Sequence, residues 1–416
     1  MSIALFEDDL VCRLDPAAVG RPAFAITCGG YRLIDVVLAL GQPVSAHVRP
    51  HLQSVVAADY ADLQHEHAPK GQAALWLNAR VVPSAAALDT LRRLLAGQRP
   101  GIVRSGDAVA LALMPHDSRV DTTGANQSIA EQLAALNLPT LEWELPLFEY
   151  AHDIIRHHMA ILCDNLEHRV ACGDYEQRAD GVFTGPDTKL GEYVVTDTSR
   201  GPIVLEAGAT IGPYCYLSGP VYVGARARVL EYAALKDGVS IGHTTKIGGE
   251  VDASIVEPYT NKQHHGFLGH SYLGSWVNLG AGTCNSDLKN TYGLVNMEYR
   301  GEKVPTGMQF VGAIVGDYAK TAINTGIFTG KTVGVCSMVY GFVTTNVPSF
   351  VNYARLFGQV TEVPVEIMVS TQRRMFERRG VAQRECDIQL LLDMYALTDH
   401  ERKQPGQTLS LEPLSL

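Results

Sequence analysis

The stretch LEAGATIGPYCYLSGPVYVGARARVLEYAALKDGVSIGHTTKIGGEV, from Leu205 to Val251, has an aliphatic residue at every sixth position. These aliphatic residues are Leu205, Ile211, Leu217, Val223, Val229, Leu235, Ile241 and Ile247. The fifth residue of each unit is small or β-branched: Ala209, Cys215, Val221, Ala227, Ala233, Val239, Thr245 and Val251. A strand alternates with a period of two and an α-helix with a period of about 3.6, so neither produces a period of six.

A period of six predicts a coil in which each hexapeptide forms one flat side of a triangular prism. The aliphatic residue points into the prism, and the small residue fits where the wall turns. This architecture is the hexapeptide parallel β-helix. Each coil buries its inner face only against the next coil, so we expect several coils and a closure at each end.

The repeat is interrupted twice. The first irregular stretch covers 257–267, after which the ladder returns at Leu268, Leu273 and Leu279. The second covers 284–310. The period of six then resumes at Val315, Thr321, Ile327, Val333 and Val339. Insertions in a solenoid leave the wall as loops, and loops on a rigid scaffold commonly carry the chemistry. We therefore expect functional residues at the two interruptions.

Between the interruptions lie two short motifs, GHSYLG at 269–274 and VNLGAGT at 277–283. Here the chain resembles the acetyltransferase half of the bacterial bifunctional glucosamine-1-phosphate acetyltransferase/N-acetylglucosamine-1-phosphate uridyltransferase family, especially a divergent branch of sugar nucleotidyltransferases. The resemblance is strongest over 201–347. It implies a left-handed β-helix and a role in sugar-nucleotide metabolism, including UDP-N-acetylglucosamine biosynthesis. The implied reaction is N-acylation of an amino sugar phosphate, with acetyl-CoA as the acyl donor.

Acyl transfer to an amine requires a base, because an ammonium group is not nucleophilic. Imidazole has the intrinsic pKa that suits this task near neutral pH. By resemblance the base is His270. The alternative is a histidine that only packs at the surface or at a cap.

The resemblance also implies residues that bind the acceptor. Tyr272 and Asn278 match positions that contact the sugar phosphate and the amine, although loop packing and an asparagine ladder are equally open roles. Asn285 matches a further position, but the tyrosine that follows it in the family is a serine here. Lys262 and Lys289 are candidate phosphate anchors, because a compact cationic charge suits a phosphate, and both can equally be solvated lysines.

The family binds its acyl-CoA donor along the groove between neighbouring prisms. Ala281 matches one backbone contact to the donor, and Gly282, Thr329 and Lys331 are further candidates. The resemblance implies a homotrimer, because the family's sites form where prisms meet.

The first 190 residues have a different pattern. Apolar runs at 3–6, 74–77, 101–103 and 108–114 alternate with helical patterns such as 85–95. This alternation predicts an α/β domain with a mostly parallel sheet. In such sheets ligands bind outside the carboxyl ends of the strands.

By resemblance this is a nucleotidyltransferase-like, Rossmann-like domain that binds a nucleotide and a sugar phosphate and uses Mg²⁺. The family's glycine-rich phosphate loop is absent, and the metal-binding aspartate is replaced by Asn-Ala-Arg at 78–80. Arg21, Asn78 and Arg80 are the binding candidates in this domain, with structural roles equally open. Arg21 can bind a phosphate bidentately or pair with the acidic run at 7–9.

The predicted domains are 1–190, 191–347 and 348–416. We expect a helix at 152–168 that leads out of the first domain, and amphipathic helices at 366–379 and 384–397 that cap the prism or pack on a neighbouring subunit. His157 and His158 are adjacent on a helix and face about 100° apart, so we expect no metal site there.

Composition limits the function further. The formal charge is −10 and no basic region dominates, so nucleic acid is not an expected partner. Apolar runs fall short of the about 20 residues that span a bilayer, and no signal peptide precedes the first strand, so we expect a cytoplasmic protein without membrane segments. A competing hypothesis is a catalytically silent trimeric scaffold that binds sugar nucleotides.

Overall fold

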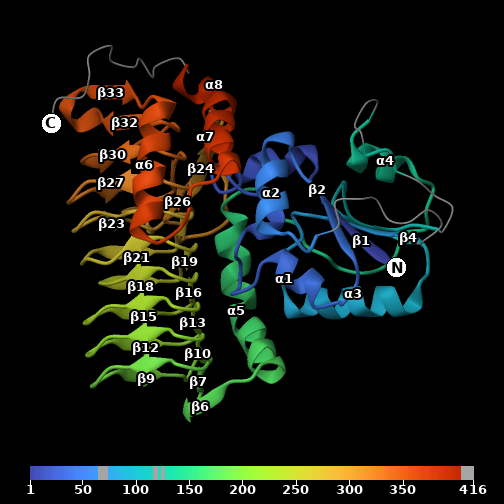
Figure 1. The fold of residues 1–416 in the computed structure, drawn as a ribbon, viewed down its shortest axis with the longest axis horizontal. Coiled ribbons are helices and arrows are strands. Elements are labelled where there is room, and N and C mark those ends of the chain that lie inside the picture. The colour runs from blue at the N-terminus through green and yellow to red at the C-terminus, as the bar shows by residue number, and fades with distance from the viewer. Residues whose placement is uncertain (64–73, 116–119, 123–126, 404–416) are drawn as a thin grey trace.

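The computed structural model describes residues 1–63, 74–115, 120–122 and 127–403. An α/β domain lies beside a long parallel β-solenoid, with helix α5 between them (Figure 1). The C-terminal helices lie against the solenoid near its last coils (Figure 1). This arrangement confirms the fold class predicted from the hexapeptide period and from the alternating pattern of the first 190 residues.

The α/β domain has a five-stranded sheet in the order β2-β1-β3-β5-β4. Its strands are β1 (Ser2–Phe6), β2 (Val44–His47), β3 (Ala74–Asn78), β4 (Gly101–Ser105) and β5 (Ala108–Leu113). Its helices are α1 (Leu33–Leu38), α2 (Gln53–Asp59), α3 (Ala85–Gly97) and α4 (Ile129–Ala135), with 3₁₀ turns η1 (Asp9–Leu14), η2 (Ala23–Ala25) and η3 (Pro50–Leu52). Strand β1 is parallel to β2 and β3, whereas β5 is antiparallel to β3 and β4. The sheet is therefore mixed rather than mostly parallel.

The solenoid has three faces of stacked short strands. Face 1 contains β7 (Val182–Thr184), β10 (Ile203–Leu205), β13 (Val221–Val223), β16 (Val239–Ile241), β19 (Ile255–Val256), β22 (Tyr272–Leu273), β26 (Ala313–Val315) and β29 (Lys331–Val333), with β6 (Glu176–Ala179) at its edge. Face 2 contains β8 (Lys189–Leu190), β11 (Thr210–Ile211), β14 (Arg228–Val229), β17 (Lys246–Ile247) and β20 (Asn261–Lys262), continued by β27 (Lys320–Thr321), β30 (Met338–Val339), β32 (Val351–Ala354) and β33 (Gln359–Glu362). Face 3 contains β9 (Val195–Asp197), β12 (Tyr216–Ser218), β15 (Ala234–Lys236), β18 (Glu250–Asp252) and β21 (Phe267–Gly269), followed by β23 (Cys284–Asn285), β28 (Gly326–Ile327) and β31 (Phe342–Val343).

The aliphatic residues of the repeat form the core of the prism, as the period of six predicts. On face 1, Leu205, Val223 and Ile241 are paired in successive strands and are at most 1% exposed. The small residues at the fifth position are buried as well. Each coil therefore buries its apolar residues against the next coil.

We expect that Ile241→Val lowers the free energy of unfolding by about 0.5–1.5 kcal/mol, because it removes one methylene from this close-packed column. Chemical denaturation measures the change. The exposed control Ile323→Val, at a side chain that is 69% exposed, should change stability by less.

The first expected interruption is not an insertion. Residues 257–267 stay on the wall, because β19, β20 and β21 pair with the strands of the coil before them. Lys262 stands in register with Ile247 and occupies the inward position that an aliphatic residue fills in the neighbouring coil. The repeat continues there with a lysine at the inward position that is aliphatic in the neighbouring coil. A pattern defined by aliphatic residues alone does not reveal this coil.

The second interruption is an insertion, as predicted. After β23 the chain leaves the wall and forms an antiparallel hairpin of β24 (Asn296–Tyr299) and β25 (Glu302–Pro305) before it returns at β26. Met297 of the hairpin is completely buried. The hairpin is therefore packed against the rest of the molecule.

The solenoid extends past both of the domain boundaries that we predicted. Strand β7, at 182–184, already pairs with β10, which places the first coil before residue 191. Strand β32, at 351–354, still pairs with β30, which places the last coil after residue 347.

The helices outside the sheet follow the predicted ranges to within a few residues. Helix α5 (Asp153–Cys172) leads out of the first domain, and α6 (Val365–Arg378) and α7 (Glu385–Leu397) are followed by α8 (Asp399–Arg402). Helix α7 packs against α2 and η3 of the α/β domain, and its Tyr395 also contacts Phe350 and Glu362 of the last coil. No helix among the described residues is both long and apolar enough to cross a bilayer.

Candidate functional site

His270 lies at the corner where the chain turns from β21 on face 3 to β22 on face 1. Its φ of 42° is in the left-handed region. Ala253, which precedes it in the same corner column, has a φ of 46°. The positive φ is thus a property of the prism corner, and it does not by itself mark a catalytic residue.

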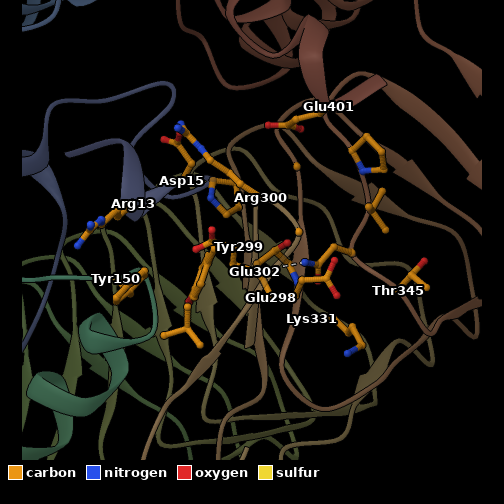
Figure 2. Close-up of a pocket in the computed structure, with 18 of the residues that line it drawn as sticks. Arg13, Asp15, Tyr150, Glu298, Tyr299, Arg300, Glu302, Lys331, Thr345 and Glu401 are labelled. Atoms are coloured by element: carbon orange, nitrogen blue, oxygen red, sulfur yellow. Dashed lines mark hydrogen bonds and ion pairs between the residues drawn. The ribbon is translucent and has the colours of Figure 1, made fainter. Parts of the chain in front are cut away.

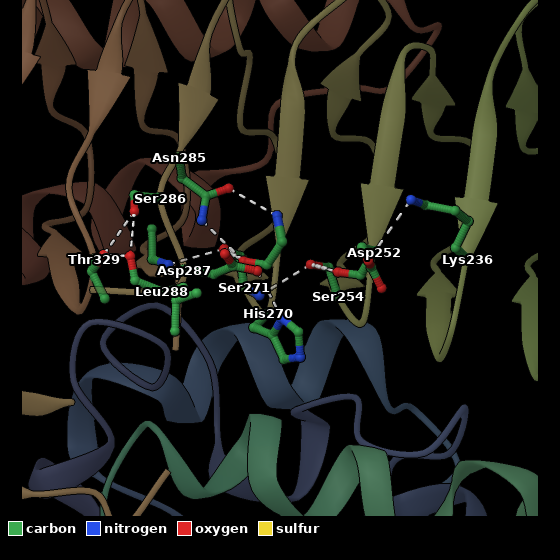
Figure 3. A network of polar contacts seen from close by, with 12 residues as sticks. Lys236, Asp252, Ser254, His270, Ser271, Asn285, Ser286, Asp287, Leu288 and Thr329 are labelled. Atoms are coloured by element: carbon green, nitrogen blue, oxygen red, sulfur yellow. Dashed lines mark hydrogen bonds and ion pairs between the residues drawn. The ribbon is translucent and has the colours of Figure 1, made fainter. Parts of the chain in front are cut away.

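The imidazole of His270 is held by residues of the insertion. Its Nδ1 lies 2.8 Å from Oδ2 of Asp287 (Figure 3). Its ring also stacks on Phe310, with centroids 5.1 Å apart. Because the carboxylate accepts a hydrogen bond, this contact places the proton of a neutral imidazole on Nδ1 and leaves Nε2 as an acceptor. The side chain is 21% exposed, so the ring is packed but reachable.

Asn285 fixes the backbone next to His270. Its side-chain amide donates to the carbonyl of Gly269 and its Oδ1 accepts from the Gly269 amide, both at 2.9 Å (Figure 3). Asn285 is 6% exposed, so both of its polar groups are used within the wall. These bonds hold the backbone of the residue before His270, and the sugar contact that the resemblance implies for Asn285 stays a prediction.

Thr329 and Lys331 lie along the same corner. The hydroxyl of Thr329 donates to Ser286 at 2.8 Å, beside Asp287 (Figure 3). Lys331 pairs in register with Ala313, whose amide donates to the hydroxyl of Ser271 at 2.9 Å. Lys331 is therefore two strands along the stack from the residue that follows His270.

A cavity of about 550 Å³ opens beside Lys331 (Figure 2). It is bounded by η1, the β24–β25 hairpin, the last coils and α8. Its basic residues are Arg13, Arg300, Lys331, Arg355 and His400, and its acidic residues are Asp15, Glu298, Glu302 and Glu401. Burial lowers the pKa of Lys331 and raises the pKa of Asp15 to about 7. The cavity therefore combines cations with a carboxyl group that can exchange a proton near neutral pH.

Three other candidates lie at different parts of the prism. Asn278 is on face 2, where its Oδ1 lies 3.5 Å from Nδ2 of Asn261, as in the asparagine ladder that we left open. Ala281 and Gly282 lie at the corner between faces 2 and 3. The structure therefore groups His270, Asn285, Thr329 and Lys331, and it does not place Asn278, Ala281 and Gly282 with them.

Two histidines that the sequence reasoning passed over lie at that second corner. His264 and His265 are exposed, and the carbonyl of His265 accepts from the amide of Gly282 at 3.0 Å. Their adjacency in the first irregular stretch is the signal that could have identified them. They are therefore the alternative candidates for the general base, and a test of His270 should include them.

The two lysines predicted as phosphate anchors are engaged by backbone carbonyls. Nζ of Lys262 donates to Gly248 and Gly266 at 2.7 Å and to His264 at 3.2 Å, and burial lowers its pKa to about 8. Lys262 is 2% exposed, so the prediction that it anchors a phosphate is wrong for this structure. Lys289 is more exposed and donates to the carbonyl of Leu294 at 2.8 Å.

Tyr272 and Arg21 meet in a buried polar cluster between the two domains. The hydroxyl of Tyr272 donates to Oε1 of Glu257 at 2.9 Å, and Nη1 of Arg21 lies 3.1 Å from the same oxygen. Arg21 also pairs with Asp317 and donates to the hydroxyl of Ser275. Tyr272 is completely buried, and burial raises its pKa well above the ordinary value. These side chains join the domains, and Arg21 does not pair with the acidic run at 7–9.

The other candidates of the α/β domain are also buried and paired. Asn78 donates to Asp8 at 2.8 Å, and Arg80 contacts both carboxylate oxygens of Asp8 at 2.7 and 2.6 Å. Arg80 is 1% exposed, so these residues have the structural role that the sequence left open. A guanidinium occupies the place where the resemblance implies a Mg²⁺ ligand, so the residues present do not fit a Mg²⁺ ion.

A second cavity, of about 820 Å³, lies at the carboxyl ends of β1 and β2. Its lining includes Glu7, Asp9, His47 and Arg49. Arg49 is paired with Glu7 at 3.0 Å. The cavity is where a ligand of such a sheet is expected, but its first loop presents carboxylates in place of a glycine-rich loop.

Comparisons with known proteins support the resemblance to sugar nucleotidyl transferases and to GlmU-like proteins. Residues 3–170 match the family described as sugar nucleotidyl transferase. The bifunctional protein GlmU of Ralstonia nicotianae is 32% identical over 134 residues, which cover 30% of this chain and 28% of that protein. The resemblance to the GlmU-like family is confirmed. GlmU of Ralstonia pickettii is 36% identical over 118 residues, covering 27% of this chain and 24% of that protein.

A third relative joins the two activities in its name. The bifunctional sugar-1-phosphate nucleotidylyltransferase/acetyltransferase of Sulfurisphaera tokodaii is 28% identical over 143 residues, which cover 34% of this chain and 36% of that protein. The chain thus spans about a quarter to a third of the length of these GlmU-like relatives.

We expect that Asn285→Ala lowers the free energy of unfolding by about 1–3 kcal/mol, because it leaves the buried amide of Gly269 without a partner. The carbonyl of Gly269 loses the Asn285 amide but keeps the hydroxyl of Ser271 as a donor. The neighbouring His270 should then lose its fixed position. The acyl-transfer rate should therefore fall, even though Asp287, the partner of His270, is still present. Denaturation and a rate assay measure the two effects. A full rate with reduced stability would contradict the positioning role.

Proposed function

We propose that the solenoid is an acyl-CoA-dependent N-acyltransferase that acts on an amino sugar phosphate in sugar-nucleotide metabolism. The observation that carries the proposal is the His270–Asp287 pair, with Nδ1 held at 2.8 Å and Nε2 left free to accept a proton. The bifunctional nucleotidylyltransferase/acetyltransferase relatives support the same reaction class.

In the proposed reaction the amine nitrogen of the sugar attacks the thioester carbon of acetyl-CoA. Nε2 of His270 takes the proton that the nitrogen loses as the amide bond forms. The carbon–sulfur bond breaks, and coenzyme A leaves as a thiolate that receives this proton from the imidazolium of His270. Asp287 stabilises the imidazolium that forms and keeps the ring in place.

We place the acyl donor and acceptor along the corner that contains His270, Thr329 and Lys331. The cations of the adjoining cavity suit phosphate groups. Ala281, Gly282 and Asn278 remain proposed contacts if a second prism brings its face 2 to this corner. A homotrimer supplies such a neighbour. Size-exclusion chromatography with light scattering should then give a mass three times that of the chain.

The α/β domain suggests a second function. The resemblance implies nucleotidyl transfer to a sugar-1-phosphate, which requires both nucleotide binding and a metal site. Its match to the sugar nucleotidyl transferase family and its cavity at the strand ends favour nucleotide binding there. The paired Asp8 and Arg80 provide no metal site for transfer. We propose that this domain binds a sugar nucleotide.

A thermal-shift titration separates the acyltransferase from a silent scaffold. Binding to the folded state alone raises the melting temperature, by an amount that grows with ligand concentration. The acyltransferase should be stabilised by coenzyme A as well as by nucleotide sugars. A shift with nucleotide sugars and none with saturating coenzyme A would favour the scaffold.

A further inference from the structure

Four cations meet on face 2 beside the end of α6. Arg228 and Lys246 occupy the same position of neighbouring strands, so their backbones are about 4.8 Å apart and both side chains leave the prism on the same side. Arg378 and Arg379 end helix α6, which lies alongside the solenoid (Figure 1). We refer to Arg228, Lys246, Arg378 and Arg379 as the face-2 cation cluster.

Hydrogen bonds tie the helix end to the strands of the cluster. Arg379 donates to the carbonyl of Thr244 at 3.2 Å and to the side chain of Asn261 at 2.5 Å. Asn261 is the next residue after Lys246 in the ladder. The guanidinium of Arg379 is thus fixed over the strand that carries Lys246. Arg228 and Arg378 are exposed, so their charged groups are open to a ligand.

The charge of this cluster is not neutralised. Within the described parts of the chain, no carboxylate forms an ion pair with any of its four members. This is unexpected in a chain with 44 acidic and 34 basic residues. Burial lowers the pKa of Lys246, and the charges of Arg379, Arg228 and Arg378 lower it further. Burial and Arg378 likewise lower the pKa of Arg379.

We infer that the face-2 cation cluster binds the diphosphate group of a nucleotide-containing ligand. Guanidinium groups match phosphate oxygens in pairs, and a lysine adds a point charge, so the cluster offers both kinds of phosphate contact. A diphosphate carries enough negative charge to relieve the repulsion among several cations, which a single carboxylate does not. Among the ligands of the proposed functions, coenzyme A and nucleotide sugars contain this group.

The inference goes beyond the proposed acyl transfer. His270 lies at the corner between faces 3 and 1, whereas the cluster lies on face 2. A diphosphate can bind the cluster whether or not His270 catalyses, and turnover can occur whether or not the cluster is occupied. The two ideas can therefore fail separately.

Calorimetric titration of the full chain tests the inference with three probes: inorganic pyrophosphate, coenzyme A and UDP-N-acetylglucosamine. The variant is the double substitution Arg228→Gln and Lys246→Gln. The control is Arg200→Gln, which removes an exposed cation that is paired with Asp237 at 2.7 Å. We expect pyrophosphate affinity to fall at least about tenfold in the double variant and to stay unchanged in the control.

The nucleotide probes identify the source of the diphosphate. A selective loss of coenzyme A affinity assigns the cluster to the acyl donor, and a selective loss of UDP-N-acetylglucosamine affinity assigns it to a nucleotide sugar. The melting temperature of the ligand-free double variant should stay the same or rise, because like charges are removed. Equal pyrophosphate affinity in all three proteins, or no binding by the wild type at millimolar pyrophosphate, would overturn the inference.

Discussion

His270→Ala is expected to lower the rate of acyl transfer by about 10²- to 10⁴-fold while coenzyme A affinity stays unchanged. The substitution removes the only group that we assign to proton transfer, and the amine cannot attack efficiently while it keeps its proton. Asp287→Asn should have a smaller effect in the same direction, because it leaves the imidazole but loses the carboxylate at 2.8 Å. Thioester consumption measures the rates, and calorimetry measures the affinity.

The matched controls are His264→Ala and His265→Ala. Both remove an exposed imidazole of the same solenoid, but at the corner between faces 2 and 3. They should retain most of the activity. A large rate loss in either control, together with normal turnover by His270→Ala, would move the base to the corner of Ala281 and Gly282.

Arg21→Met is expected to lower the free energy of unfolding by about 3–5 kcal/mol, because it leaves a buried carboxylate without its cation. Glu257 is 1% exposed and Asp317 is 4% exposed, and both pair with Arg21. Thr27 also donates its amide and hydroxyl to Glu257, so the cluster joins the domains. Urea denaturation followed by fluorescence and by domain-specific proteolysis measures the loss.

The defect of Arg21→Met should depend on pH. Burial already raises the pKa of Asp317, and the loss of the cation raises it further. The folded variant then binds more protons than the unfolded chain between about pH 4, the ordinary pKa of a carboxyl group, and the raised pKa. Stability of the variant therefore falls as pH rises through this window. The loss of unfolding free energy relative to the wild type should therefore be smaller near pH 4 than at neutral pH.

Arg200→Met is the control for this prediction. Its ion pair with Asp237 is exposed, and such pairs contribute less than about 1 kcal/mol. Equal losses of stability in Arg21→Met and Arg200→Met would mean that the interdomain cluster does not hold the domains together.

The period of six was sufficient to predict the solenoid, because inward burial repeats once for each flat side of the prism. Ile211, Val229 and Ile247 follow one another in register as the spacing requires. The next inward residue is Lys262, whose ammonium group is satisfied by three carbonyls. A pattern of aliphatic residues cannot detect such a substitution, and so the sequence suggested a break where the wall continues.

The candidate site around His270 was predictable only in part, because motif spacing does not reveal contacts between residues that are distant in the sequence. The motif and the insertion pointed to His270, and the structure adds Asp287, which comes from the second interruption. The partner of Arg21 could not be read from spacing, because Glu257 and Asp317 are more than two hundred residues away and meet it only when the domains dock. Tyr272 has the right spacing for a substrate contact, but its hydroxyl lies within that cluster.

The most direct test of the account is turnover of acetyl-CoA by the wild-type chain with glucosamine-1-phosphate and a panel of other amino sugar phosphates. We predict release of coenzyme A thiol together with stoichiometric N-acetyl sugar for at least one acceptor. No turnover with any amino sugar phosphate would contradict the acyltransferase. If nucleotide sugars but not coenzyme A then raise the melting temperature, the result favours the scaffold.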